Sequence, residues 1–265
     1  MNIYVDLTRE FNRGKLRAML SSGQAVVLHR LAVMSKDGDW ILRENSSDLD
    51  HVLCVLASHG AHYRFGAPLD ERWLAGGWSS HFEFQCDRLR VRTDFVTRPP
   101  RISPARLAAM WREQEACDLP FVKACDLAEL KKTNREKDYA VIGELARMLR
   151  YPAEQLLLSR SARDLILLAE QHPGLVERLV PQRPVLATIG RGLAELEAGL
   201  DAERRALMHL NERRLENYLA AAQRWTVLWT ELADEVAGLP LPDAHRIIVS
   251  RAEGVLPFVP TGVVQ

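Results

Sequence analysis

The stretch that most constrains the fold of this 265-residue chain is residues 75–101, AGGWSSHFEFQCDRLRVRTDFVTRPPR. Polar and apolar residues alternate in two runs, 81–84 and 89–97. The polar pair Asp87-Arg88 lies between the runs, and two prolines at 99–100 end the second one. Two alternating runs joined by a short polar turn predict a β-hairpin.

A two-residue turn at Asp87-Arg88 fixes which side chains of the hairpin lie opposite each other. Because strand side chains alternate between two faces, one face then carries three cross-strand pairs: His81 with Asp94, Glu83 with Arg92, and Gln85 with Arg90. The other face is apolar and is expected to pack on the core through Phe82, Phe84, Val91, Thr93 and Phe95. The charged face is either a solvated surface with cross-strand ion pairs or part of a functional site.

Composition sets few limits on function. The 35 Lys and Arg balance the 35 Asp and Glu, so the net charge gives no sign of a nucleic-acid or membrane partner. Four scattered cysteines lack the spacing of a zinc site and the density of a disulfide scaffold. The first residues lack the apolar region of a signal peptide, and no apolar run reaches the roughly 20 residues of a membrane span. We therefore expect a cytoplasmic protein with no membrane partner.

Local signals suggest further elements before and after the hairpin. Residues 7–21 have helix signals, 24–34 fit a strand or a buried helix, and 35–39 have turn chemistry. A helix is expected from its N-cap Ser47 to about His59, where Gly60 stops it. A strand at 62–65 and a strand or helical turn at 71–74 should follow. After the hairpin, we expect a helix from Ser103-Pro104 and a strand at 121–124 that ends at Asp126, the N-cap of the next helix.

A D-x-D sequence at the start of the helix after Ser47 superficially resembles a metal-binding motif. It consists of Asp48, Leu49 and Asp50. Because it falls in the first helical turn, where acids favour the helix dipole, capping is the preferred interpretation.

The second informative stretch is 126–150, where two apolar helical runs are interrupted at Thr133-Asn134. The interruption concentrates four cations near Asp138, namely Lys131, Lys132, Arg135 and Lys137. A cationic cluster at a helix junction suits an anion such as a triphosphate, and it also fits a solvated basic turn.

After Pro152 the composition changes to long helices, which we expect at 153–171, 185–200, 202–236 and 242–253. Trp225 and Trp229 lie four residues apart on one helix face, which suits core packing or a partner-helix surface. The sequence thus predicts an α+β fold, in which a small mixed β-sheet with flanking helices occupies 1–150 and a helical domain occupies 151–265. Self-association into a homo-oligomer through the amphipathic helix is also expected.

Taken in order, these segments resemble a known superfamily. A helix and a short strand precede the Ala75-Gly76-Gly77 turn, a strand bearing carboxylates follows, and residues 126–145 read D-L-x-x-L-K-x-T-x-R-x-K-D-x-x-x-I-x-x-L. This order resembles the nucleotidyltransferase-fold superfamily, in particular its minimal bacterial and archaeal members near toxin components of abortive-infection and toxin–antitoxin systems. The resemblance covers about residues 48–150.

The resemblance implies a metal-dependent transfer of a nucleotide from an NTP to a hydroxyl of a protein or RNA. Active members hold two divalent metals with a D-x-D pair on one strand and a third acid on a neighbouring strand, because hard cations prefer carboxylate oxygens. Here the corresponding triplet is Arg92-Thr93-Asp94, in which arginine replaces the first acid. Glu83 and Asp94 are then the expected Mg²⁺ ligands, His81 is a ligand or base, and Asp70 is a more distant acid.

The remaining site residues follow from the same resemblance. The small-residue turn would let the phosphates approach the backbone at Gly76, Gly77 and Ser79, and the triphosphate would lie on Lys131, Arg135 and Lys137.

Because arginine stands at a metal position, two non-catalytic alternatives stay open. In the first, the fold binds a nucleotide, nucleic acid or protein, and Arg92 replaces the charge of the metal. In the second, the chain is a structural partner in a defence or toxin–antitoxin complex and works through the tryptophan face of its helical half.

Overall fold

A computed structural model describes residues 2–260 and has an α+β fold. Its contacts define two compact units, each described separately below. The first comprises the described parts of 1–28, 32–122 and 215–265, and the second comprises 29–31 and 123–214. The sequence suggested one boundary at 150. The division differs because helices after 123 pack with the helical segment, whereas the C-terminal helices pack on the sheet.

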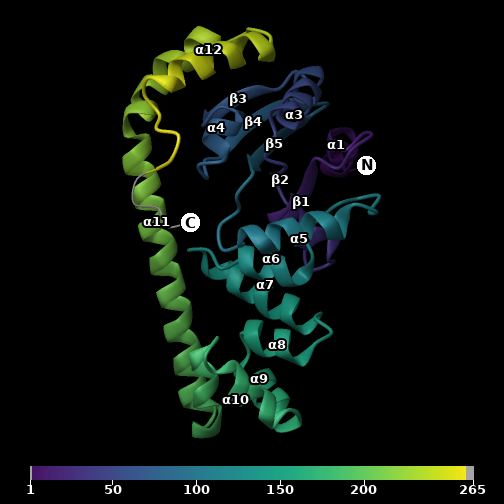
Figure 1. Ribbon diagram of the computed structural model, residues 1–265, viewed down its shortest axis with the longest axis vertical. Helices are drawn as coiled ribbons and strands as arrows, with labels where there is room; N and C mark the ends of the chain where they lie inside the picture. The colour runs from purple at the N-terminus through teal and green to yellow at the C-terminus, as the bar shows by residue number, and fades with distance from the viewer. Residues whose placement is uncertain (1, 261–265) are drawn as a thin grey trace. The chain divides into compact units, whose positions relative to one another are not determined.

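The first unit is built on a five-stranded sheet of order β1-β2-β5-β4-β3 (Figure 1). β2 and β5 are parallel, and all other neighbours are antiparallel. The strands are β1 (Ala18–Ser21), β2 (Asp37–Leu42), β3 (His62–Gly66), β4 (Ser80–Cys86) and β5 (Leu89–Val96). The small mixed sheet expected from the sequence is therefore confirmed.

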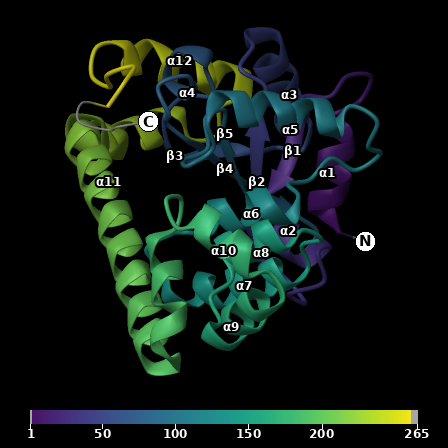
Figure 2. The same cartoon turned by 60° about the horizontal axis from the view of Figure 1, so that its bottom comes forward.

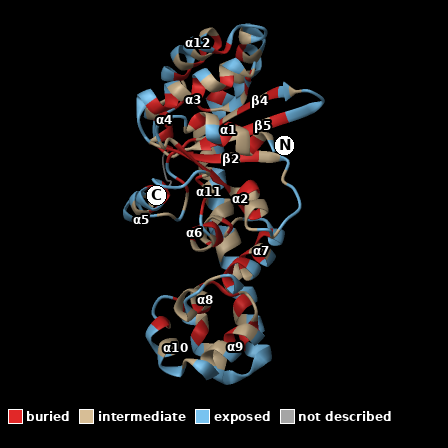
Figure 3. Ribbon diagram, turned by 90° about the vertical axis from the view of Figure 1, so that its right-hand side faces the viewer, coloured by how far each residue is buried: buried red, intermediate tan, exposed pale blue. Residues whose placement is uncertain are grey.

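The β4–β5 hairpin has the predicted register. His81 pairs with Asp94, Glu83 with Arg92 and Gln85 with Arg90. The turn at Asp87 has a φ of 52°, a left-handed conformation that Asp tolerates. Figure 3 shows the exposed hairpin tip, where Leu89 is exposed although it belongs to β5.

The apolar face of the sheet forms the main core. Phe11 packs edge-on against Trp40 at 5.3 Å between ring centroids, and Trp40 stacks on Phe95 at 5.4 Å. The helices whose residues join this core are α1 (Ile3–Phe11), α3 (Ser46–Ser58), α4 (Glu71–Leu74), the later part of α11 (Leu193–Val236) and α12 (Leu241–Glu253). Burial of large aromatic side chains is a major source of stability for such a core.

Two tryptophans of α11 cover the outer edge of β3. The indole nitrogen of Trp225 donates to the carbonyl of Gly66 at 2.8 Å, and that of Trp229 donates to the carbonyl of Arg64 at 3.0 Å. These two carbonyls are two residues apart and so point to the same side of the strand. The helix thus satisfies an edge that would otherwise be open to pairing with another chain. Of the two interpretations of this face, core packing is the one observed.

The chain before β2 differs from expectation. Instead of one helix over 7–21, α1 ends at Phe11 and β1 begins at Ala18. The side chain of Asn12 causes the reversal, because its oxygen accepts from the amides of Arg17 and Ala18 while its nitrogen donates to two carbonyls. The stretch 24–34 supplies only the end of a short helix, α2 (Ser22–Leu28).

Residues 35–39 are not simply a turn, since β2 begins at Asp37. Gly38 serves close packing rather than a turn, because a Cβ there would overlap the rings of Tyr4 and Trp40. Pairing with strands on both sides therefore overrides the local turn preference of Asp-Gly-Asp.

Helix boundaries agree in part. Ser103 caps α5 (Pro104–Gln114) as predicted, and 71–74 is the short helix α4. The N-cap of α3 is Asn45 rather than Ser47, whose hydroxyl donates to the Asn45 side chain. The segment 121–124 forms only one bridge, between Leu20 and Phe121, and the next helix begins earlier than predicted, with Lys123 rather than Asp126 as its N-cap.

The second unit is helical. It contains α6 (Ala124–Leu130), α7 (Glu136–Arg147), α8 (Pro152–Leu158), α9 (Ala162–Gln171), α10 (Pro173–Leu179), the 3₁₀ helix η1 (Pro184–Arg191) and the first part of α11. Its core is made of leucines such as Leu156, Leu165 and Leu196, and Glu203 accepts hydrogen bonds from Arg160 and Arg183. The stretch predicted as one helix over 153–171 is interrupted at 159–161, and the two predicted helices over 185–236 form η1 and the continuous α11.

Within residues 2–260, no helix is both long enough and apolar enough to cross a bilayer.

Candidate functional site

On the second face of the sheet, a row of neighbouring side chains crosses all five strands, and four of its five members are polar. Strand pairing places Ser21 next to Asp39, Asp39 next to Asp94, Asp94 next to His81, and His81 next to Phe65. Neighbouring strands lie about 4.8 Å apart, so the four polar members form a nearly continuous line. The adjacent row contains Asp37, Arg92, Glu83 and His62.

This register reveals an acidic pair that the sequence reasoning missed. Asp37 and Asp39 flank Gly38 on β2, so both side chains point to the polar face. Asp94 lies beside Asp39 on the parallel strand β5. The pattern of two acids on one strand and a third on its neighbour is therefore met at Asp37-Gly38-Asp39, and not at Arg92-Thr93-Asp94. The signal in the sequence was a D-x-D directly before the apolar run Trp40–Leu42.

One carboxylate oxygen of Asp37 lacks a hydrogen bond. Its Oδ1 atom is buried and has no hydrogen-bond partner, and Arg92 Nη1 lies 3.8 Å from it. The Asp37 side chain as a whole is 44% exposed, so a cation can reach its carboxylate in addition to Arg92. Arg92 therefore lies beside the acidic pair instead of replacing one of its members.

Asp94 is held in place through one oxygen. Its Oδ1 lies 2.7 Å from His81 Nδ1 and 3.7 Å from Arg64 Nη1. Both contacts involve the same carboxylate oxygen, Oδ1. His81 in turn contacts Ser79 Oγ through Nε2 at 2.7 Å and stacks on Phe65 at 4.2 Å.

Glu83 lies among the side chains of Arg90, Arg64 and His62. Arg90 donates two hydrogen bonds of 2.9 Å to it, while Arg64 and His62 each lie 3.4 Å away. Burial alone would raise the pKa of Glu83, but the hydrogen bonds from Arg90 and the charges of Arg90, His62 and Arg64 outweigh burial and lower it. The cross-strand ion-pair interpretation therefore describes Glu83, although its main partner is Arg90 and not the directly opposite Arg92.

The Gly76-Gly77 turn is covered by the chain itself. A Cβ at Gly76 would overlap the carbonyl of Phe258, and the carbonyl of Gly77 accepts a hydrogen bond of 2.7 Å from Tyr218. The close approach that these glycines allow is therefore used by the C-terminal segment and α11. Asp70 is the N-cap of α4 and pairs with Arg72 at 2.8 Å, which accounts for it structurally.

The predicted triphosphate ligands belong to the second unit, whereas the sheet belongs to the first. The carboxylate of Asp138 is buried and accepts hydrogen bonds from Lys131 at 3.3 Å, Thr133 at 2.6 Å and Arg135 at 2.8 Å. These contacts fix the α6–α7 junction and engage two of the three predicted cations. Lys137 is exposed.

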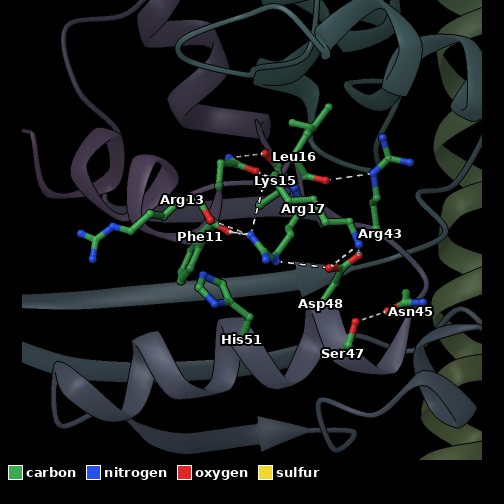
Figure 4. Close-up of polar contacts among 12 residues, drawn as sticks. Phe11, Arg13, Lys15, Leu16, Arg17, Arg43, Asn45, Ser47, Asp48 and His51 are labelled. Atoms are coloured by element: carbon green, nitrogen blue, oxygen red, sulfur yellow. Dashed lines mark hydrogen bonds and ion pairs between the residues drawn. The ribbon is translucent and has the colours of Figure 1, made fainter.

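The D-x-D at the start of α3 is also structural (Figure 4). Asp48 is buried, both of its oxygens accept from Lys15 Nζ at 2.9 Å, and Arg17 Nε lies 3.2 Å from Oδ1. The side chain therefore joins α3 to the loop between α1 and β1 instead of capping the helix. Asp50 is exposed.

A cavity of about 460 Å³ lies among α3, α4 and α12, which are neighbours in Figures 1 and 2. Its lining includes Asp50, Asp70 and His245. The Nδ1 atom of His245 lies 2.7 Å from the hydroxyl of Tyr63, and that hydroxyl accepts the amide of Leu69 at 2.9 Å. The hydrogen bond between Tyr63 and His245 anchors α12 to the sheet.

Within residues 2–260, no three His, Cys, Asp or Glu side chains are arranged as a ready metal site. Asp37, Asp39 and Asp94 nevertheless supply the oxygen donors that Mg²⁺ prefers, from adjacent strands, and one of those oxygens is buried and unsatisfied. Comparison of the chain with models of protein families, with curated proteins and with solved structures finds no significant match.

Proposed function

We propose that this protein is a metal-dependent nucleotidyltransferase whose Mg²⁺ ligands are Asp37 and Asp39 of β2 and Asp94 of β5. The observation that carries the proposal is the strand register, which sets a D-x-D pair beside a third acid on one sheet face. That arrangement is what the resemblance to the nucleotidyltransferase-fold superfamily requires. It also removes the objection that an arginine occupies the first acidic position.

The neighbourhood of the three acids suits a phosphate chain. Mg²⁺ in this position would polarise the α-phosphate of an NTP and acidify the attacking hydroxyl. Arg64 and Arg92 lie beside Asp94 and Asp37 respectively, where their guanidinium groups can pair with phosphate oxygens.

A small-residue turn that meets the family expectation better than Gly76-Gly77 lies at the end of β1. Ser21 is the strand neighbour of Asp39, and Ser22 and Gly23 follow it. Ser22 has a φ of 48°, so the chain turns sharply at this point into α2. The backbone there is the proposed place of approach for the phosphates, and the acceptor is a protein or RNA hydroxyl.

The proposal is tested by incubating the full-length chain with α-labelled NTPs, Mg²⁺, total RNA and a protein extract. We expect label transfer that requires Mg²⁺ and falls at least about 100-fold in Asp39→Asn and in Asp94→Asn, because loss of a metal ligand removes the main charge stabilisation. Glu83→Gln is the matched control on the same face and should keep most of the activity. Equal loss in all three variants, or transfer without metal, would contradict the proposal.

A second candidate is a nucleotide-binding protein without chemistry. It is favoured by the guanidinium groups already beside the acids, Arg92 at Asp37 and Arg64 at Asp94. It predicts that NTP raises the melting temperature equally with Mg²⁺ and with EDTA, and that Arg92→Gln removes the shift. A role as a structural partner in a defence or toxin–antitoxin complex remains a proposal too, although the tryptophan face offered for it covers β3.

A further inference from the structure

Ser79, His81 and Asp94 form a continuous hydrogen-bonded chain on the polar face. Ser79 Oγ lies 2.7 Å from His81 Nε2, and His81 Nδ1 lies 2.7 Å from Asp94 Oδ1. A carboxylate can only accept, so the shared proton on this side belongs to Nδ1 of the imidazole. With a single proton on the ring, at Nδ1, Nε2 is an acceptor and the hydroxyl of Ser79 donates to it.

The local backbone holds this chain in place. Gly66 has a φ of 92°, and a Cβ there would lie 2.6 Å from both His81 Cδ2 and the carbonyl oxygen of Ser79. Only glycine therefore lets β3 approach the histidine and the serine together. Phe65 stacks on the imidazole at 4.2 Å with an interplanar angle of 21°, which fixes the ring orientation.

The hydrogen-bonded chain brings Ser79 close to the proposed metal ligands, where its hydroxyl could act as a nucleophile. Ser79 is separated from Asp94 by a single imidazole ring, and Asp94 is the strand neighbour of Asp39. Ser79 is partly exposed. A nucleophilic hydroxyl needs a base in hydrogen-bond contact and a third group that orients the base, and both are present here.

Resting on the proposed function, we propose that Ser79 is itself an acceptor, so that the protein transfers a nucleoside monophosphate from an NTP to its own serine. In this step Ser79 Oγ attacks the α-phosphorus and forms a phosphodiester bond. The bond between the α-phosphorus and the bridging oxygen to the β-phosphate breaks, and pyrophosphate leaves with the electron pair. The serine proton passes to His81 Nε2, and Asp94 stabilises the resulting imidazolium.

The test is intact-mass and peptide mass spectrometry of the full chain after incubation with Mg²⁺ and each of the four NTPs. We expect a gain of one nucleoside monophosphate residue, located on Ser79. The gain should vanish in Ser79→Ala, return at a reduced rate in Ser79→Thr, and be unchanged in Ser58→Ala, which alters an exposed serine at the end of α3. His81→Asn should slow the modification at least about 100-fold, in the range of general-base catalysis.

A parallel measurement separates this proposal from the function on which it rests. Binding of a non-hydrolysable NTP analogue in Mg²⁺ is measured by calorimetry, and transfer to added RNA or protein is measured by label. If the analogue binds and label reaches other acceptors while the mass of the chain is unchanged, self-modification is refuted and the proposed function stands. If nothing binds and no label is transferred, both are refuted. Modification at another residue, with Ser79→Ala unaffected, also overturns the assignment of Ser79.

Discussion

Removing the carboxylate of Asp48 should weaken the first unit substantially. The Asp48 side chain is only 2% exposed and holds Lys15 and Arg17, whose side chains are 51% and 16% exposed. Breaking a buried ion pair from one side costs about 3–5 kcal/mol, because the remaining charge stays buried without its partner. In Asp48→Ala, the exposed Lys15 ammonium can be hydrated, and the Arg17 guanidinium keeps its hydrogen bonds to backbone carbonyls. The free energy of unfolding should therefore fall by about 3 kcal/mol, the lower end of that range.

The assay is urea denaturation of the full chain followed by tryptophan fluorescence. All 6 tryptophans of the sequence lie in segments assigned to the first unit, so the signal reports on that unit alone. With a slope of about 2 kcal/mol per molar urea, the midpoint should fall by about 1.5 M. Lys15→Met, which removes the exposed partner, should cost less than about 1 kcal/mol. A midpoint shift below about 0.5 M for Asp48→Ala, or a larger effect for Lys15→Met, would refute the reasoning.

Three further outcomes follow from the same structure. Burial lowers the pKa of His245 below its ordinary value of 6.5, against the opposing charges of Asp70 and Asp50. The unfolded chain therefore takes up the proton first, and the first unit should lose stability as the pH falls below about 6.5, a dependence that His245→Gln should flatten in urea denaturation. Burial raises the pKa of Asp138, but the hydrogen bond from Thr133 and the charges of Lys131 and Arg135 outweigh burial and lower it below its ordinary value of 3.8. The second unit should therefore lose stability as the pH falls below about 3.8. Asp138→Asn should reduce that loss and speed amide exchange in α6 and α7 at neutral pH. Trp225→Phe leaves the carbonyl of Gly66 without its 2.8 Å hydrogen bond, costs about 1–3 kcal/mol, and should raise amide exchange in β3.

The hairpin could be predicted from the sequence because its information is local. Strict alternation and the Asp87-Arg88 turn determine its register, and the burial of Phe82 and Phe95 follows from the same pattern. Helix α5 was likewise marked by Ser103 and Pro104, which act within one helical turn.

The acidic pair could not be recognised in the same way. Asp37-Gly38-Asp39 has the local chemistry of a turn, and it becomes a strand only because β1 and β5 pair with it from both sides. The partner strand β5 lies more than 50 residues further along the chain, so the neighbour relation of Asp39 and Asp94 is not visible in any local window. The contacts of Lys131 and Arg135 with Asp138 could not be predicted for a related reason, since the burial of Asp138 depends on packing that the sequence pattern does not encode.

The central claim, that Asp37, Asp39 and Asp94 form one cation site, is tested most directly by calorimetric titration of Mn²⁺ into the full chain with a non-hydrolysable NTP analogue. We predict saturable binding that Asp39→Asn and Asp94→Asn each weaken at least about tenfold, as expected when one of a few oxygen ligands is lost, while Glu83→Gln binds as the unaltered chain does. Binding that depends on Glu83 and ignores Asp39, or no metal-dependent binding at all, would contradict the account.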